Sequence, residues 1–428
     1  MTQESPRSTT GVSRRGLLGL AGAGIGVGVV GAGIGIGVSA STSTLGSSGA
    51  ATTYPFFAEH QSGIVTAAQD RLHFAAFDVS EGTTRTELVG LLKDWSYAAA
   101  RMTKGDQVST AGATGGSIYA PPDDTGEALG LPAAGLTITI GFGPSLFTDG
   151  DGKDRFGLAS KRPSRLIELP AFAGDNLDPA LSNGDLCIQA CSDDPQVAVH
   201  AIRNLSRIAF GRADLRWSQL GFGRTSSTTR SQTTPRNLFG FKDGTANLKA
   251  EDASLVEKDI WAHDDDGASW MAGGSYLVSR KIRMHIETWD HQSLLEQQTV
   301  IGRDKGEGAP LSGGSEFSTP NFHKRKDGKP AIDTTSHVSV AHPSHNSGAQ
   351  LLRRGYNFVD GNDSLGRLNA GLFFIGYQRD PENQFVRIQN ALASHDAMNE
   401  YVQHVSSGIF AVPPGASTGG YVGETLFA

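Results

Sequence analysis

The order of expected strands and helices constrains this fold most, because a similar series occurs twice along the chain. In the first half, apolar residues recur with the period of a strand or of a helix in the order β-α-β-β-α-β, the ferredoxin-like unit. The elements are a strand at 72–79, a helix through 88–102, strands at 136–142 and 185–191, a helix at 195–210 and a strand at 214–222. The pattern Thr84-x-x-Glu87 predicts a capping box that starts the first helix.

The second half has the same pattern without obvious sequence identity to the first. Its predicted elements are a strand at 275–286, a helix from near Asp290, strands at 337–341 and 371–377, a helix at 385–404 and a strand at 408–412. We therefore expect an α+β fold with two ferredoxin-like β-α-β-β-α-β domains and antiparallel sheets, of the dimeric α+β barrel type, at 54–230 and 231–428. The insertions at 103–135 and 301–336 are long for plain connections and predict a site or an interface.

The first forty residues have the features of an export signal. Ser13-Arg14-Arg15-Gly16-Leu17-Leu18 resembles a twin-arginine motif, and residues 17–38 contain no charge and nine glycines. We expect a twin-arginine signal peptide at 1–40, cleaved after Ala40, and a flexible linker at 41–53. The alternative is an uncleaved anchor, because 22 uncharged residues could cross a bilayer about 30 Å thick.

Charge and cysteine content exclude several classes of protein. The net charge is −7 for the whole chain and 34 − 43 = −9 without residues 1–40, which argues against nucleic acid or an anionic membrane as a partner. The two cysteines, Cys187 and Cys191, lie on one expected strand at a separation of about 13 Å, too far apart for a disulfide. We expect buried thiols, as suits a protein that folds in the cytoplasm before export.

Three polar elements indicate the chemistry. Asp243 lies in the string Gly240-Phe-Lys-Asp-Gly-Thr-Ala-Asn247, His337 begins an expected strand that leads to Pro343, and Arg353 follows His337 by sixteen residues. Each has an ordinary explanation when taken alone: an Asp-Gly turn, a core or surface histidine, and a cation on an edge strand. Their combination is more specific.

Taken together, these residues resemble the dye-decolourising peroxidase family, and are closest to its exported twin-arginine branch, some of whose members accompany bacterial iron-uptake systems. Further matches extend the resemblance over most of the chain: His60-Gln-Ser-Gly-Ile64, Asn183-Gly-Asp-Leu186 and Pro235-Arg-Asn-Leu238. The resemblance implies one haem b per chain with His337 as the iron ligand. It also implies that Asp243 transfers the proton of H₂O₂ and that Arg353 stabilises the departing charge.

The same resemblance implies further haem contacts. They come from Gly244, Thr245 and Ala246, from Arg303 to a propionate, from Arg353, and from His342, Pro343 and Ser344. His342 departs from the family, whose members often have Asn before this proline. Leu372, Phe373 and Phe374 would form an apolar wall near the distal face.

The expected function is therefore an exported haem peroxidase that reduces H₂O₂ and oxidises bulky organic donors such as dyes and phenols. It would act outside the cell or in the cell envelope or periplasm, with the twin-arginine machinery and iron-uptake proteins as partners. Surface tryptophans could relay electrons, with Trp217, Trp261, Trp270 and Trp289 as candidates. Two alternatives remain: a haem-handling or iron-uptake protein of deferrochelatase type, and a non-haem metal protein that uses His337, His342 and His345.

Overall fold

The computed structural model describes residues 52–428, which form one compact unit. The predicted signal peptide and linker residues 41–51 lie outside the described residues. None of the helices in 52–428 has both the length and the apolar character that a membrane span requires. The division into domains at 54–230 and 231–428 stays a prediction.

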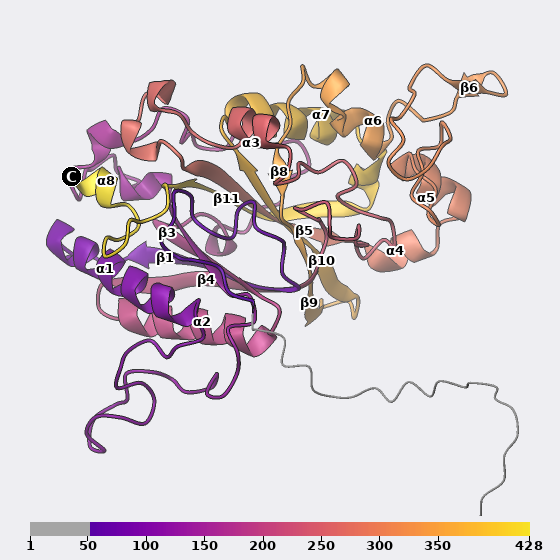
Figure 1. The fold of residues 1–428 in the computed structure, drawn as a ribbon. Helices are drawn as coiled ribbons and strands as arrows, with labels where there is room; N and C mark the ends of the chain where they lie inside the picture. Colours follow the sequence, from indigo (N-terminus) through magenta and orange to yellow (C-terminus); the bar gives the residue numbers. More distant parts are fainter. Residues whose placement is uncertain (1–51) are drawn as a thin grey trace, which may run out of the picture. The chain divides into compact units, whose positions relative to one another are not determined.

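One antiparallel sheet passes through both halves of the chain (Figure 1). Its strand order is β5-β11-β2-β3-β1-β4-β9-β10-β8, and an additional pairing of β5 with β10 closes the sheet on itself. Within residues 52–428 the strands of this sheet are β1 (Arg71–Val79), β2 (Thr137–Phe142), β3 (Leu186–Ser192), β4 (Ala213–Arg224), β5 (Ser275–Met284), β8 (Leu352–Arg353), β9 (Tyr356–Asn362), β10 (Leu368–Gln378) and β11 (Val402–Val412). The neighbours β2-β3-β1-β4 and β9-β10-β5-β11 each have the ferredoxin-like order, which confirms the predicted α+β class.

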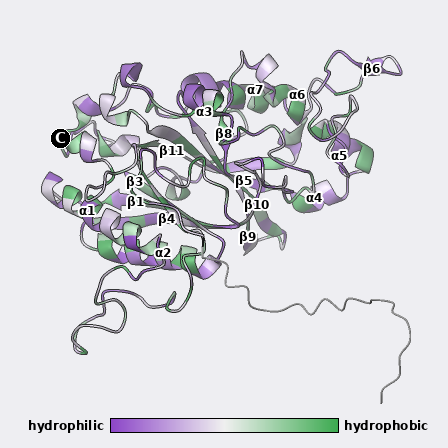
Figure 2. Ribbon diagram, viewed as in Figure 1, coloured by the Kyte–Doolittle hydropathy of each residue, from purple (hydrophilic) through white to green (hydrophobic). Residues whose placement is uncertain are grey.

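The helices are α1 (Arg85–Met102), α2 (Pro195–Ala209), α3 (Ala253–Asp259), α4 (Ile286–Asp290), α5 (Leu294–Ile301), α6 (His337–Ala341), α7 (Arg387–His395) and α8 (Glu424–Phe427). Helix α1 begins with the predicted capping box of Thr84 and Glu87. Helices α1 and α2 lie side by side against the strands of the first half (Figure 1). Both show hydrophilic and hydrophobic residues, as amphipathic helices do (Figure 2).

Alternate residues of the strands enter two different cores. On β1, Leu72, Phe74 and Ala76 belong to one cluster, which also holds residues of β10 and β11. Ala75, Phe77 and Val79 point to the opposite face and pack in the cluster that contains Leu88 and Trp95 of α1. This division follows from the two-residue period of a strand, and it makes the closed sheet the rigid support of the molecule. Cys187 and Cys191 are buried free thiols, as predicted.

Two predictions for the second half are wrong. Residues 337–341 form helix α6, and β9 occupies the position of the expected second strand. Five residues are too few for the apolar pattern to separate helix from strand, and the Ser336 carbonyl accepts a helical hydrogen bond from the Val340 amide. The helix expected at 385–404 ends at His395, because the Asp396 side chain caps a new 3₁₀ turn (Ala397–Glu400), after which β11 begins.

Candidate active site

The loop that contains Asp243 is held by its own backbone and by glycine geometry. The Asp243 amide donates to the Pro235 carbonyl at 2.9 Å, and the Asn237 side-chain amide donates to Asp243 Oδ2 at 3.1 Å. Gly244 has φ +82°, and a Cβ there would lie 2.8 Å from the Cα of Ser226. Only glycine therefore fits this turn, which packs against the chain that leaves β4.

Arg353 lies on β8, next to β10, and points at the Asp243 carboxylate. Its Nη1 donates to Asp243 Oδ1 at 2.8 Å. The Asn247 side chain holds the backbone of Arg353, because Oδ1 accepts from the Arg353 amide at 2.7 Å and Nδ2 donates to the Arg353 carbonyl at 2.9 Å. The two residues predicted to act on peroxide, 110 positions apart, are thus in direct contact.

His337 is the first residue of α6, and Asp396 orients its ring. Nδ1 of His337 lies 2.6 Å from Asp396 Oδ2, and the Asp396 side chain is 4% exposed. A carboxylate accepts, so Nδ1 carries the proton and the Nε2 lone pair is available to a metal. Burial lowers the pKa of His337, but the Asp396 carboxylate more than offsets this, and the pKa is raised.

The charges of Arg353 and Asp243 also reach the His337 ring, where Arg353 lowers the pKa and Asp243 raises it. Burial also lowers the pKa of Arg303; the Glu316 carboxylate opposes this shift, and the positive charge of Arg353 adds to it. The Arg303 side chain is fixed by two hydrogen bonds from Nη1, to the carbonyls of Gly308 and Glu316. The site therefore combines the His337 imidazole, the carboxylates of Asp243 and Asp396, and the guanidinium groups of Arg303 and Arg353.

The remaining residues predicted to contact haem differ in their surroundings. Thr245 Oγ1 donates to Glu316 Oε1 at 3.2 Å, while Ala246 is exposed. Burial lowers the pKa of His342, and the charges of His345 and Arg303 act in the same direction. The Nδ1 of His342 accepts from the Ser344 amide at 3.2 Å and caps a 3₁₀ turn (Pro343–His345), in which Pro343 is half-buried and Ser344 is exposed.

The residues present fit a haem group. His337 supplies an imidazole nitrogen whose orientation is fixed by a carboxylate, and Arg303 supplies a buried guanidinium of the kind that binds a propionate. Asp243 and Arg353 supply an acid–base group and a donor whose charges reach the same imidazole.

Two expectations about other residues need correction. Leu372, Phe373 and Phe374 do not form one wall, because Phe373 lies in the core inside the sheet while its neighbours pack against two other clusters. The four tryptophans proposed as surface relays are buried: Trp217, Trp261, Trp270 and Trp289 are at most 7% exposed.

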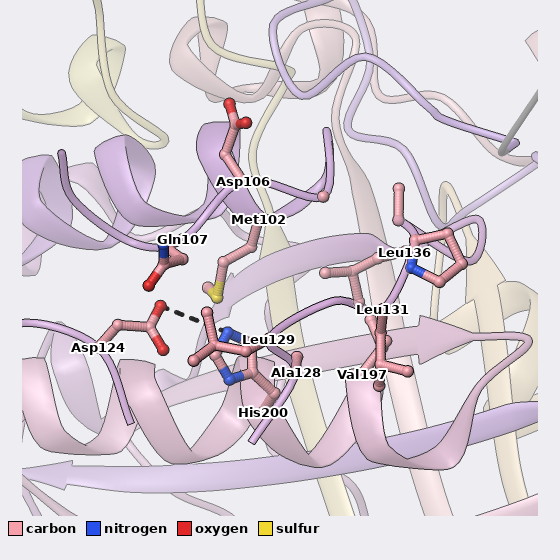
Figure 3. A pocket seen from close by; sticks show the side chains of 13 residues that line it. Met102, Asp106, Gln107, Asp124, Ala128, Leu129, Leu131, Leu136, Val197 and His200 are labelled. Carbon is pink, nitrogen blue, oxygen red and sulfur yellow. Dashed lines mark ion pairs between the residues drawn. The ribbon is translucent and has the colours of Figure 1, made fainter. Parts of the chain in front are cut away.

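The alternative of a three-histidine metal site gains no support. Among residues 52–428 there is no group of three or more His, Cys, Asp or Glu side chains placed to hold a metal ion. A small cavity lies elsewhere, between the 103–135 insertion and α2, and Asp124 and His200 are among the residues that line it (Figure 3). His200 Nε2 is 3.6 Å from Asp124 Oδ2. The polar groups of this cavity pair with one another and attach this insertion to α2, with Glu127 as the second partner of His200.

Several residues of the site were missed by sequence reasoning. Asn237 and Asn247 lie in motifs that the sequence singles out, but no pattern gave them a role. Asp396 and Glu316 reach the site from chain segments far from their partners, and no local signal marks either contact.

Comparison with known proteins gives one consistent family. Residues 61–223 match the profile described as Dyp-type peroxidase, N-terminal, and residues 234–417 match its C-terminal counterpart. Proteins named deferrochelatase from Yersinia pestis bv. Antiqua (strain Nepal516) and Escherichia coli (strain K12) are each 35% identical. The first alignment covers 87% of this chain and 84% of the relative, and the second covers 87% and 86%.

Solved structures agree. DtpA from Streptomyces lividans, described as an oxyferrous/water mixed complex, superposes with a TM-score of 0.80 at 40% identity, over 88% of this chain and 98% of the other. A DyP-type peroxidase from Streptomyces coelicolor gives a TM-score of 0.79 at 39% identity, over 87% and 96%. DypB from Rhodococcus jostii in complex with heme, at 20% identity, shares the fold.

Proposed function

Because the chain belongs to the Dyp-type peroxidase family and is a haem-dependent peroxidase, we propose that it uses one haem b, held by His337, to reduce H₂O₂ and oxidise bulky organic donors such as dyes and phenols. The observation that supports this most is the contact of Asp243 with Arg353 in a site where both charges act on His337. Bound haem supplies the redox chemistry of the O–O bond. The protein supplies proton transfer and charge stabilisation.

We assign the proton transfer to Asp243. Its carboxylate takes the proton from one oxygen of H₂O₂ and returns it to the other oxygen, which leaves as water. The Arg353 guanidinium, 2.8 Å from that carboxylate, stabilises negative charge as the oxygens separate. Asn237 and Asn247 keep the two groups in place through the contacts described above.

The proposal includes export. Residues 13–18 resemble a twin-arginine motif, so the protein would cross the membrane folded and act outside the cell or in the cell envelope or periplasm. The twin-arginine machinery and proteins of iron uptake would be its partners.

A second candidate function is the release of iron from haem, since the curated relatives at 35% identity are named deferrochelatase. The Asp243–Arg353 pair favours the peroxidase, because a protein that only handles haem needs neither group.

Haem-loaded protein separates the two functions. We expect oxidation of an anthraquinone dye or a phenol only in the presence of H₂O₂, with no iron captured by a ferrous chelator. Accumulation of chelated iron and intact porphyrin, without donor oxidation, would reject the peroxidase as the main function.

A further inference from the structure

Lys249 is a buried cation next to the turn that contains Asp243, and the mechanism above does not use it. It lies two residues after the string Gly240–Asn247 and is 9% exposed. Its Nζ donates to the Ser227 carbonyl and to Ser227 Oγ, each at 2.7 Å, and reaches the Gly244 carbonyl at 3.5 Å. Within residues 52–428 it forms no salt bridge, which is unusual for a buried lysine.

These contacts join the two segments that hold the catalytic pair. Gly244 follows Asp243, and the Ser227 carbonyl also accepts from Asn247 Nδ2 at 3.1 Å. Asn247 in turn holds the backbone of Arg353. A single ammonium group therefore connects the turn of Asp243 with the chain that supports Arg353, and charge-assisted hydrogen bonds are about twice as strong as neutral ones.

We propose that Lys249 is a positioning residue for the Asp243–Arg353 pair, which its protonated ammonium holds in register through Gly244 and Ser227. This inference rests on the proposed roles of Asp243 and Arg353. Loss of the Lys249 proton weakens the connection, and the reaction with peroxide slows as pH rises.

The surroundings of Lys249 support this. Burial lowers its pKa to about 8, and the charge of Arg353 on β8 acts in the same direction, as does Arg230 after β4. The carboxylates of Glu251 and Asp252, before α3, oppose these effects without cancelling them. The ammonium therefore changes its charge near pH 8 instead of near its usual value.

The test compares the parent with Lys249→Met, Lys249→Arg and, as a control, Lys281→Met, which removes a largely buried lysine of β5 paired with Asp360. In haem-loaded protein, the parent should lose its fast reaction with H₂O₂ above about pH 8. Lys249→Arg should keep it to higher pH, because arginine stays charged. Lys249→Met should be about tenfold slower or more at pH 7.

Hydrogen exchange in full-length protein gives a readout independent of activity. The amides of Asp243 and Asn247 donate within this turn, to Pro235 and Gly244. Corrected for intrinsic rates, both should lose protection in Lys249→Met, and in the parent above pH 8, but not in Lys281→Met. If Lys249→Met does not fold, the parent and Lys249→Arg are compared. If their rates of reaction with H₂O₂ fall at the same alkaline pH, the proposal is overturned.

Unchanged exchange together with an unchanged pH profile in Lys249→Met would also overturn it. Failure of the proposed function would look different, because Asp243 and Arg353 variants would then react at the parent rate while exchange still responded to Lys249.

Discussion

At the scale of single residues, the two carboxylates Asp243 and Asp396 have different partners. Asp243 pairs with the Arg353 guanidinium at 2.8 Å. Asp396 contacts the imidazole and caps the turn that begins at Ala397. In the proposed mechanism, proton transfer and orientation of the iron ligand are thus assigned to different carboxylates.

The assignment of the iron ligand can be tested by comparing two histidines. His337→Ala should abolish the ferric high-spin spectrum or leave loosely held haem, since it removes the imidazole oriented by Asp396. His342→Ala should keep the iron bond, because its Nδ1 is engaged by Ser344. Loss of the ligand in His342→Ala instead would show that the assignment is wrong.

The raised pKa of His337 predicts pH-dependent haem uptake. A protonated imidazole cannot bind iron, so haem affinity of the apoprotein should fall as pH drops through the raised pKa of His337. In Asp396→Asn the carboxylate that raises the pKa of His337 is gone, while burial still lowers that pKa. The midpoint of the pH dependence of haem uptake should therefore move to lower pH. The stability of the haem-free protein depends on pH in the opposite sense. The pair of protonated His337 with Asp396 stabilises the fold below about pH 6.5, and this stabilisation is lost as pH rises through the raised pKa of His337. Equal pH midpoints of haem uptake in the parent and in Asp396→Asn would contradict this explanation.

At the scale of elements, local patterns predicted the strands and helices of the first half within a few residues, because their apolar residues recur regularly and both helices have a start signal. The errors lie around the site. Residues 337–341 and 385–404 have short or continuous patterns whose outcome depends on tertiary contacts, above all on Asp396. The sequence was sufficient to predict Asp243, His337 and Arg353 as site residues. It did not predict the contact of Asp396 with His337, 59 residues earlier in the chain.

Glu316 attaches the 301–336 insertion to the loop at 240–247, which contains Asp243. Its carboxylate pairs with Lys242 and accepts from Thr245, and although burial raises its pKa, these partners lower it overall. A lowered pKa means stability present above about pH 4.5 and lost as pH falls through the folded value.

Glu316→Gln should therefore reduce the free energy of unfolding at pH 7 by about 1 kcal/mol or more. The difference should shrink towards pH 4 in denaturant melts. Glu307→Gln, an exposed change in the same insertion, serves as the control. An equal loss for Glu316→Gln at both pH values would show that the ion pair does not hold this insertion.

At the scale of the whole molecule, both halves contribute to one closed sheet, while the site residues lie only in the second half. Such a site exists only in the folded chain, which suits an export route for folded proteins. Arg14→Lys combined with Arg15→Lys should therefore retain the full-length precursor in the cytoplasm, because the receptor recognises the arginine pair. Appearance of a mature form beginning near Ser41 outside the membrane would reject this route.

The proposed function depends above all on the action of Asp243 and Arg353 on peroxide. The most direct measurement is stopped-flow mixing of haem-replete Asp243→Ala and Arg353→Leu with H₂O₂, monitored by the change in haem absorption. At least one variant should react about 10² to 10⁴-fold more slowly than the parent, with nearly the same haem content. If both haem-replete variants react at the parent rate, the catalytic assignment is wrong and the haem-handling function moves ahead.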